Sequence, residues 1–107
     1  MNIQFKLNST VIWTSTNIRM AEAFCQACEE IAGADYVPTL TSGLEGIHSE
    51  ESGHYYGRAL DFRSHDLPND GEILWKIKQR FEEILGADFL CLLEDNHFHL
   101  QRDRHSF

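Results

Sequence analysis

The fold of this chain is decided by residues 88–101, DFLCLLEDNHFHLQ. This segment is strand-forming on both sides of the polar triplet at 94–96, which predicts a strand, a tight turn or bulge, and a second strand. In the second strand His97 and His99 are two residues apart, so both imidazoles are expected on one face of a sheet while Phe98 faces the other. The segment therefore predicts a histidine pair on the sheet face opposite the core.

Helix and strand patterns alternate along the rest of the chain. Apolar residues recur every three or four positions over 17–32 and 72–85, and a glycine follows each stretch, which predicts two helices; Thr16 or Asn17 is the expected N-cap of the first. Further short strands are expected within 3–14, 36–40 and 59–63. This order predicts an α+β fold, a central antiparallel sheet with two helices packed on one face, in a single domain over residues 1–107.

Composition excludes several classes of partner. Nine Lys+Arg residues against 17 Asp+Glu residues give a net charge of −8, which is the wrong sign for binding nucleic acid or an anionic membrane. The N-terminal residues lack the pattern of a signal peptide and no apolar run is long enough to span a membrane, so we expect cytoplasmic synthesis. The number of cysteines is odd, three, so they cannot all pair in disulfides, which favours a reducing compartment. We also expect the chain to be a monomer.

Six histidines in 107 residues are a high count, and their positions suggest a metal site. His54 precedes Asp61 by seven residues, and Gly57 and Ala59 between them permit a close approach of the backbone. Together with one histidine of the pair on the last strand, this supplies two nitrogen donors and one carboxylate, a set suited to catalytic zinc. Spacing alone leaves open that these histidines are a solvated polar face of a binding module; His65 and His105 are expected to be solvent-exposed.

A family resemblance favours the metal site. Residues 54–61 read His-X-X-Gly-X-Ala-X-Asp, with Ser52 ahead of them, and resemble the zinc signature of the D-alanyl-D-alanine carboxypeptidase and L-alanyl-D-glutamate endopeptidase family. The wider segment 40–61 resembles the hedgehog signalling domain, which shares that zinc-peptidase fold. Like that domain, the chain continues to a Glu, a short spacer and a His-X-His strand at 94–99. The resemblance covers residues 40–101, more than half of the chain.

The resemblance implies a role for each matched residue. His54, Asp61 and His99 would be the ligands of Zn²⁺, Glu94 the general base, and His97 a group that stabilises the oxyanion or transfers a proton. Some carboxypeptidase relatives place the base three residues before the ligand, which would instead make His97 the ligand and Glu94 its base.

The implied substrate is a peptide stem of bacterial peptidoglycan, cut by an endolysin-like enzyme of phage or prophage origin that reaches the cell wall after release. These peptidases usually carry an arginine after a Ser-Gly pair to hold the substrate carboxylate, but here Ser42-Gly43 precedes Leu44-Glu45, so Arg58 or Arg63 would have to substitute. We therefore expect the loops 41–57 and 64–71 to select the substrate. Candidate substrate-binding residues are His48, Ser52, Tyr56 and Arg58.

The missing arginine also permits an alternative function. A domain of the hedgehog-like fold can keep a zinc site and use its surface to bind a partner without hydrolysing a peptide. The sequence therefore carries two hypotheses, a zinc peptidase and a catalytically weak or inactive zinc-binding interaction domain.

Overall fold

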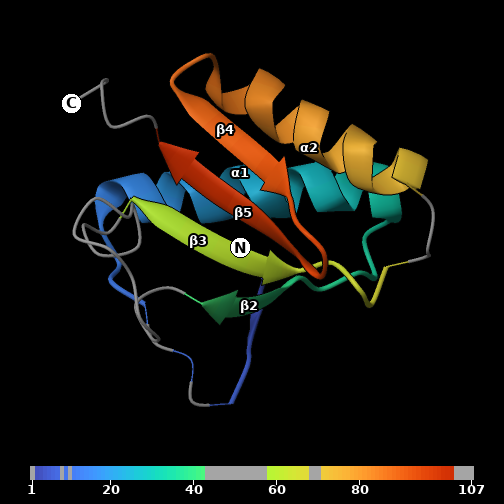
Figure 1. Ribbon diagram of the computed structural model, residues 1–107, viewed down its shortest axis with the longest axis horizontal. Helices are drawn as coiled ribbons and strands as arrows, with labels where there is room; N and C mark the ends of the chain where they lie inside the picture. Colours follow the sequence, from blue (N-terminus) through green and yellow to red (C-terminus); the bar gives the residue numbers. More distant parts are fainter. Residues whose placement is uncertain (1, 8, 10, 43–57, 68–70, 103–107) are drawn as a thin grey trace.

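The computed structural model of the chain describes residues 2–7, 9, 11–42, 58–67 and 71–102. In chain order the elements are β1 (Gln4–Phe5), α1 (Ser15–Ala32), β2 (Thr39–Ser42), β3 (Ala59–Arg63), α2 (Gly71–Leu85), β4 (Phe89–Leu93) and β5 (His97–Arg102). The strands form a single sheet in the order β1-β2-β3-β5-β4 (Figure 1). The predicted α+β class is confirmed, and β3 and β5 lie side by side within the sheet.

The sheet is mixed, so the prediction of a wholly antiparallel sheet was wrong. β3 pairs antiparallel with β2 and β5, and β4 pairs antiparallel with β5, but β1 runs parallel to β2. The Gln4 N–H donates to the Pro38 carbonyl and the Lys6 N–H to the Leu40 carbonyl, both at 2.9 Å. Because α1 connects β1 to β2, the chain returns to the sheet in the same direction. Of the described residues in 3–14, only the two of β1 form a strand.

Helix α1 begins two residues earlier than predicted, and its N-cap is Thr14 instead of Thr16 or Asn17. The Thr14 hydroxyl oxygen accepts the Asn17 backbone N–H at 3.1 Å. The Asn17 side chain is buried and donates to the Ile12 carbonyl at 2.7 Å, so it fastens the preceding segment to the helix. Helix α2 agrees with its prediction to within one residue. Neither helix combines the length and the apolar character that crossing a membrane requires, within the part of the chain described here.

Strand β2 lies later in the chain than the predicted segment 36–40. The Tyr36 N–H donates to the Gly33 carbonyl at 3.2 Å, in the turn that follows α1. Pro38 has no backbone N–H to donate in a hydrogen bond to a neighbouring strand. The strand therefore begins only at Thr39.

Both helices cover the same face of the sheet, and the core lies between them and the strands (Figure 1). Phe24 of α1 stacks on Phe62 of β3 with ring centroids 4.6 Å apart. The Phe24 ring also meets Phe98 of β5 at 5.0 Å and Phe81 of α2 at 6.4 Å, both edge-on. All four rings are fully buried. Because side chains alternate along a strand, the neighbours of Phe62 and Phe98 point to the open face.

Two of the three cysteines belong to this core. Cys28 and Cys91 are buried and unpaired, and Cys25 is half-buried. Burial raises the pKa of the Cys28 thiol, and it raises the pKa of Cys91 to about 12. Both thiols therefore stay protonated and pack as small apolar groups.

Candidate functional site

Asp61 and His99 face each other on the open side of the sheet. They lie directly opposite in the antiparallel pairing of β3 with β5. The Asp61 Oδ1 atom is 2.8 Å from the His99 Nδ1 atom, and the two side chains are only 13% and 14% exposed. The sheet register thus joins two residues that are 38 positions apart in the sequence.

The second nitrogen of His99 is also engaged. Its Nε2 atom is 2.9 Å from the Gln101 Oε1 atom. Because Asp61 and Gln101 each contact one ring nitrogen, together they fix the orientation of the imidazole. Burial lowers the pKa of His99, but the hydrogen bonds to Asp61 and Gln101 and the charges of Asp61 and Glu94 outweigh burial and raise this pKa above its ordinary value. The position therefore favours positive charge next to Asp61.

His97 and Glu94 form a second pair beside the first. The His97 Nε2 atom lies 3.1 Å from Glu94 Oε1 and 3.8 Å from Asp61 Oδ2. The other ring nitrogen of His97 lies 2.7 Å from the side-chain oxygen of Asn96. The Glu94 backbone N–H donates to the His97 carbonyl at 3.0 Å, which closes the turn between β4 and β5. His97 is therefore close to two carboxylates, that of the exposed Glu94 and that of Asp61, which is paired with His99.

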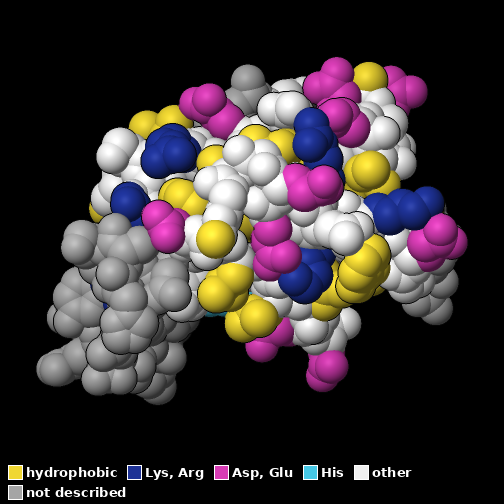
Figure 2. Space-filling model, turned by 90° about the horizontal axis from the view of Figure 1, so that it is seen from above, with side chains coloured by type: hydrophobic (Ala, Val, Ile, Leu, Met, Phe, Trp, Pro, Cys, Tyr) yellow, Lys and Arg dark blue, Asp and Glu magenta, His cyan; other side chains and the backbone are white. Residues whose placement is uncertain are grey.

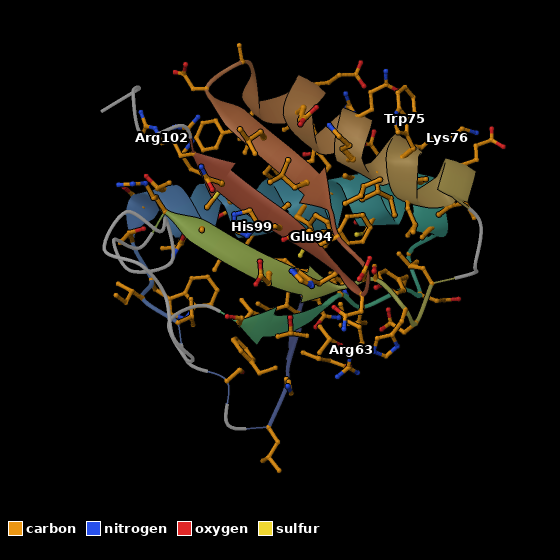
Figure 3. The ribbon with its side chains drawn as sticks, in the orientation of Figure 1. Arg63, Trp75, Lys76, Glu94, His99 and Arg102 are labelled. Carbon is orange, nitrogen blue, oxygen red and sulfur yellow. The ribbon has the colours of Figure 1, made fainter. Side chains whose placement is uncertain are left out.

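The structure brings four of the predicted site residues together: Asp61, Glu94, His97 and His99. Figure 3 labels two of them, His99 on β5 and Glu94 after the end of β4. Four other predicted site residues lie outside the described residues: His48, Ser52, His54 and Tyr56.

The remaining predicted residue, Arg58, is described. It precedes β3 and is buried, with a relative exposure of 8%. Its carbonyl accepts the Arg102 N–H at 3.0 Å, which extends the pairing of β3 with β5. Arg58, one of the two predicted substitutes for the missing arginine, is therefore largely closed to solvent.

A pocket of about 290 Å³ lies at the end of the sheet where β3 stops, and two of the four residues, Asp61 and His97, line it. Its lining also includes three basic residues, Lys6, Arg63 and His65. Sequence reasoning weighed Arg63 but not Lys6, because no local signal places the N-terminal segment beside β2. His65 is exposed, as expected, and lies at this pocket.

The donor atoms suit zinc, although the described residues do not complete a site. Asp61 and His99 offer a carboxylate oxygen and an imidazole nitrogen, two of the ligand types that zinc takes. No group of three or more His, Cys, Asp or Glu residues within the described ranges is arranged to hold a metal ion. The sequence offers His54, which lies outside those ranges, as a third donor.

Comparisons of the chain with protein-family models, with curated proteins and with solved structures found no match.

Proposed function

We propose that this chain is a zinc-dependent peptidase of the D-alanyl-D-alanine carboxypeptidase and hedgehog fold, acting on peptide stems of peptidoglycan. The observation that carries the proposal is the contact between Asp61 and His99, 2.8 Å apart on the open face of the sheet, with the His97–Glu94 pair beside it. Acidic and basic groups of this kind, gathered on a sheet face opposite a packed core, are typical of a reaction centre.

In this proposal His54, Asp61 and His99 hold the metal. The distances support His99 over His97 as the ligand, because His99 lies 2.8 Å from Asp61 and His97 lies 3.8 Å from it. Gln101 would then act as the outer partner of His99, since its side-chain oxygen lies 2.9 Å from the ring nitrogen that does not face Asp61. Such a contact orients a ligating imidazole and fixes which nitrogen binds.

Zinc supplies Lewis acidity, which polarises a peptide carbonyl and allows water to ionise near neutral pH. Glu94 would accept the proton of the attacking water, because its carboxylate is 48% exposed and therefore open to solvent. His97, 3.1 Å from Glu94, can receive or return that proton and donate to the developing oxyanion. The amine leaving group would take the proton as the peptide bond breaks.

The test is mass spectrometry of purified peptidoglycan incubated with the zinc-loaded chain. We expect new peptide fragments from the wild type and a loss of about 10²–10⁴-fold in their rate of release in Glu94→Ala, the range for removal of a general base. Asp95→Ala is the matched control, since Asp95 is the next residue of the same exposed turn. It should cut at the wild-type rate.

Bound zinc is measured in the same preparations. One equivalent should be present in the wild type and in Glu94→Ala, and it should be lost in Asp61→Asn. A wild type that holds zinc but releases no fragment from several wall types would reject the peptidase and favour the zinc-binding interaction domain. A wild type that holds no zinc would reject both functions.

A further inference from the structure

Two aromatic rings are exposed together at the β1 edge of the sheet. Phe5 of β1 and Trp13, shortly before α1, meet edge to face, with ring centroids 6.3 Å apart. Their side chains are 52% and 41% exposed. Leu7, Ile12 and Ile18 are exposed as well, so this stretch holds five of the eight large apolar side chains that are exposed in the described ranges. The chemistry proposed above uses neither ring of this aromatic pair.

The backbone that carries the aromatic pair is fixed to the fold. Phe5 is held in β1, because the N–H groups of the residues on either side of it donate to backbone carbonyls of the neighbouring segment at 2.9 Å. The carbonyl of Ile12, the residue before Trp13, accepts the buried Asn17 side chain at 2.7 Å, which ties Trp13 to α1. A ligand that binds the two rings therefore does not have to order the chain first, which lowers the entropic cost of binding.

The stretch that carries the aromatic pair is polar but almost uncharged. Between Asn2 and Ile18 the one charged residue is Lys6, whereas 24% of the whole chain is charged. The same stretch is rich in Ser, Thr, Asn and Gln. On the surface seen in Figure 2, by contrast, apolar side chains are interspersed with acidic and basic ones. An anionic membrane would require several basic side chains, so rings among neutral hydrogen-bonding groups favour a neutral ligand rich in hydroxyl groups.

A sugar ring has this chemistry. The C–H groups on one face of a β-linked pyranose pack against the negative face of an aromatic ring. Its hydroxyl and acetamide groups can exchange hydrogen bonds with neutral polar side chains. We propose that the aromatic pair Phe5–Trp13 binds the glycan strand of peptidoglycan. The inference rests on the proposed peptidase function, because that glycan carries the peptide stems.

The position of the aromatic pair sets the length of stem that can connect it to the candidate site. In the sheet β2 separates β1 from β3, so β1 lies about 9.6 Å from the strand that carries Asp61, at about 4.8 Å per strand. An extended peptide advances by about 3.3–3.6 Å per residue. Phe5 is opposite the buried Leu40, which places its ring on the helix side of the edge and lengthens this path. The bond that is cut is therefore at least about three residues from the glycan.

The test is a titration of the chain with the β-1,4-linked tetramer of N-acetylglucosamine, followed by ¹⁵N-edited NMR. The chain has two tryptophans and hence two indole N–H signals, which the variant Trp75→Phe assigns. We expect millimolar tetramer to shift the Trp13 indole signal and the amide signals of residues 4–6 and 12–14. The Trp75 indole signal should stay in place, because Trp75 lies on α2, which packs beside β4 at the opposite edge of the sheet (Figure 3).

Phe5→Ala and Trp13→Ala should each weaken the binding about tenfold, the order expected for the loss of one ring contact. Phe5 is the more exposed of the two, so Phe5→Ala serves as the second variant if Trp13→Ala fails to fold. Trp75→Ala is the matched control, because it removes a tryptophan that is 51% exposed, and it should bind like the wild type. No binding, or binding that neither variant weakens, would overturn the proposal.

Sedimentation velocity of the same samples tests the other use of an apolar patch, contact with a second copy of this chain. We expect a monomer with and without the tetramer. A dimer that Trp13→Ala dissociates and that the tetramer leaves intact would assign the rings to self-association and overturn the glycan site.

The tetramer contains no peptide, so its binding and the cleavage of peptidoglycan can fail separately. Binding of the tetramer without release of peptide fragments from peptidoglycan would retain the glycan site and reject the peptidase. Release of fragments by a chain that does not bind the tetramer would retain the peptidase and reject the glycan site.

Discussion

Replacing His99 by glutamine tests how much the positive charge of its imidazole, between β3 and β5, contributes to the stability of the fold. The imidazole of His99 lies 2.8 Å from Asp61 and 2.9 Å from Gln101. Burial lowers the pKa of His99, but its hydrogen bonds and the neighbouring carboxylates raise that pKa by more, so the folded protein favours the imidazolium. Glutamine cannot gain a proton, and the variant therefore loses the charge while it keeps a polar side chain.

The sign of the pH effect follows from the direction of this shift. An unfolded histidine has a pKa of about 6.5, and the folded value lies above it. The stabilisation is fully present below about pH 6.5 and is lost as the pH rises through the folded pKa. A hydrogen bond to a charged group contributes about 1.5–3 kcal/mol, and solvent screens this pair little because both side chains are less than one-sixth exposed. We expect His99→Gln to be about 2 kcal/mol less stable than the wild type at slightly acid pH.

The assay is urea unfolding in the presence of a chelator, at a series of pH values from slightly acid to alkaline. Far-UV circular dichroism is the better probe, since Trp13 and Trp75 are 41% and 51% exposed and report folding weakly. His97→Gln is the matched control, and it should cost less because His97 is 28% exposed and its nearer carboxylate is the exposed Glu94. A stability difference between wild type and His99→Gln that stays constant or grows with pH would refute the reasoning.

Three further predictions concern the core, the sheet edge and the metal. Phe24→Ala should lower the free energy of unfolding by about 3–5 kcal/mol in urea titrations, because it removes the ring that contacts three other buried rings. Glu82→Ala should cost about 1–3 kcal/mol in the same measurement, since the Glu82 carboxylate accepts the Cys91 N–H at 2.9 Å, whereas the exposed Glu83→Ala should change little. Zinc at 100 times its Kd should stabilise the wild type by about 2.7 kcal/mol in thermal unfolding, and an equal gain in Asp61→Asn would contradict the proposed ligand set.

Local patterns in the sequence were sufficient to predict the elements that carry the site. Alternation in 59–63 predicted the open-face position of Asp61, and alternation after the turn predicted that of His99. The direct pairing of these two residues is a matter of register, which depends on contacts between distant strands and leaves no trace in either segment alone. The sequence therefore predicted the face on which each residue lies, and the structure supplied their distance.

Other features depend on choices between equivalent local signals. Thr14, Thr16 and Asn17 are all good N-caps, and Thr14 is used because the Asn17 side chain is buried and bonds to the Ile12 carbonyl. The parallel pairing of β1 with β2 depends on where α1 returns the chain, so the arrival of Lys6 at the pocket could not be read from its neighbours in the sequence.

The alternation of side chains in β3 and β5 places the residues that pack the core on one face of the sheet and the residues of the candidate site on the other. Phe62 and Phe98 pack into the core on one side, whereas Asp61, His97 and His99 lie on the other side, away from the packed rings. A substitution on the open side can therefore change the chemistry at little cost to the core. Deleting one residue from the turn that joins β4 to β5 would exchange the two sides of β5 and disrupt both the core and the candidate site. Redesign of this protein is consequently best done by point substitution on the sheet and by changing lengths only in loops away from that turn.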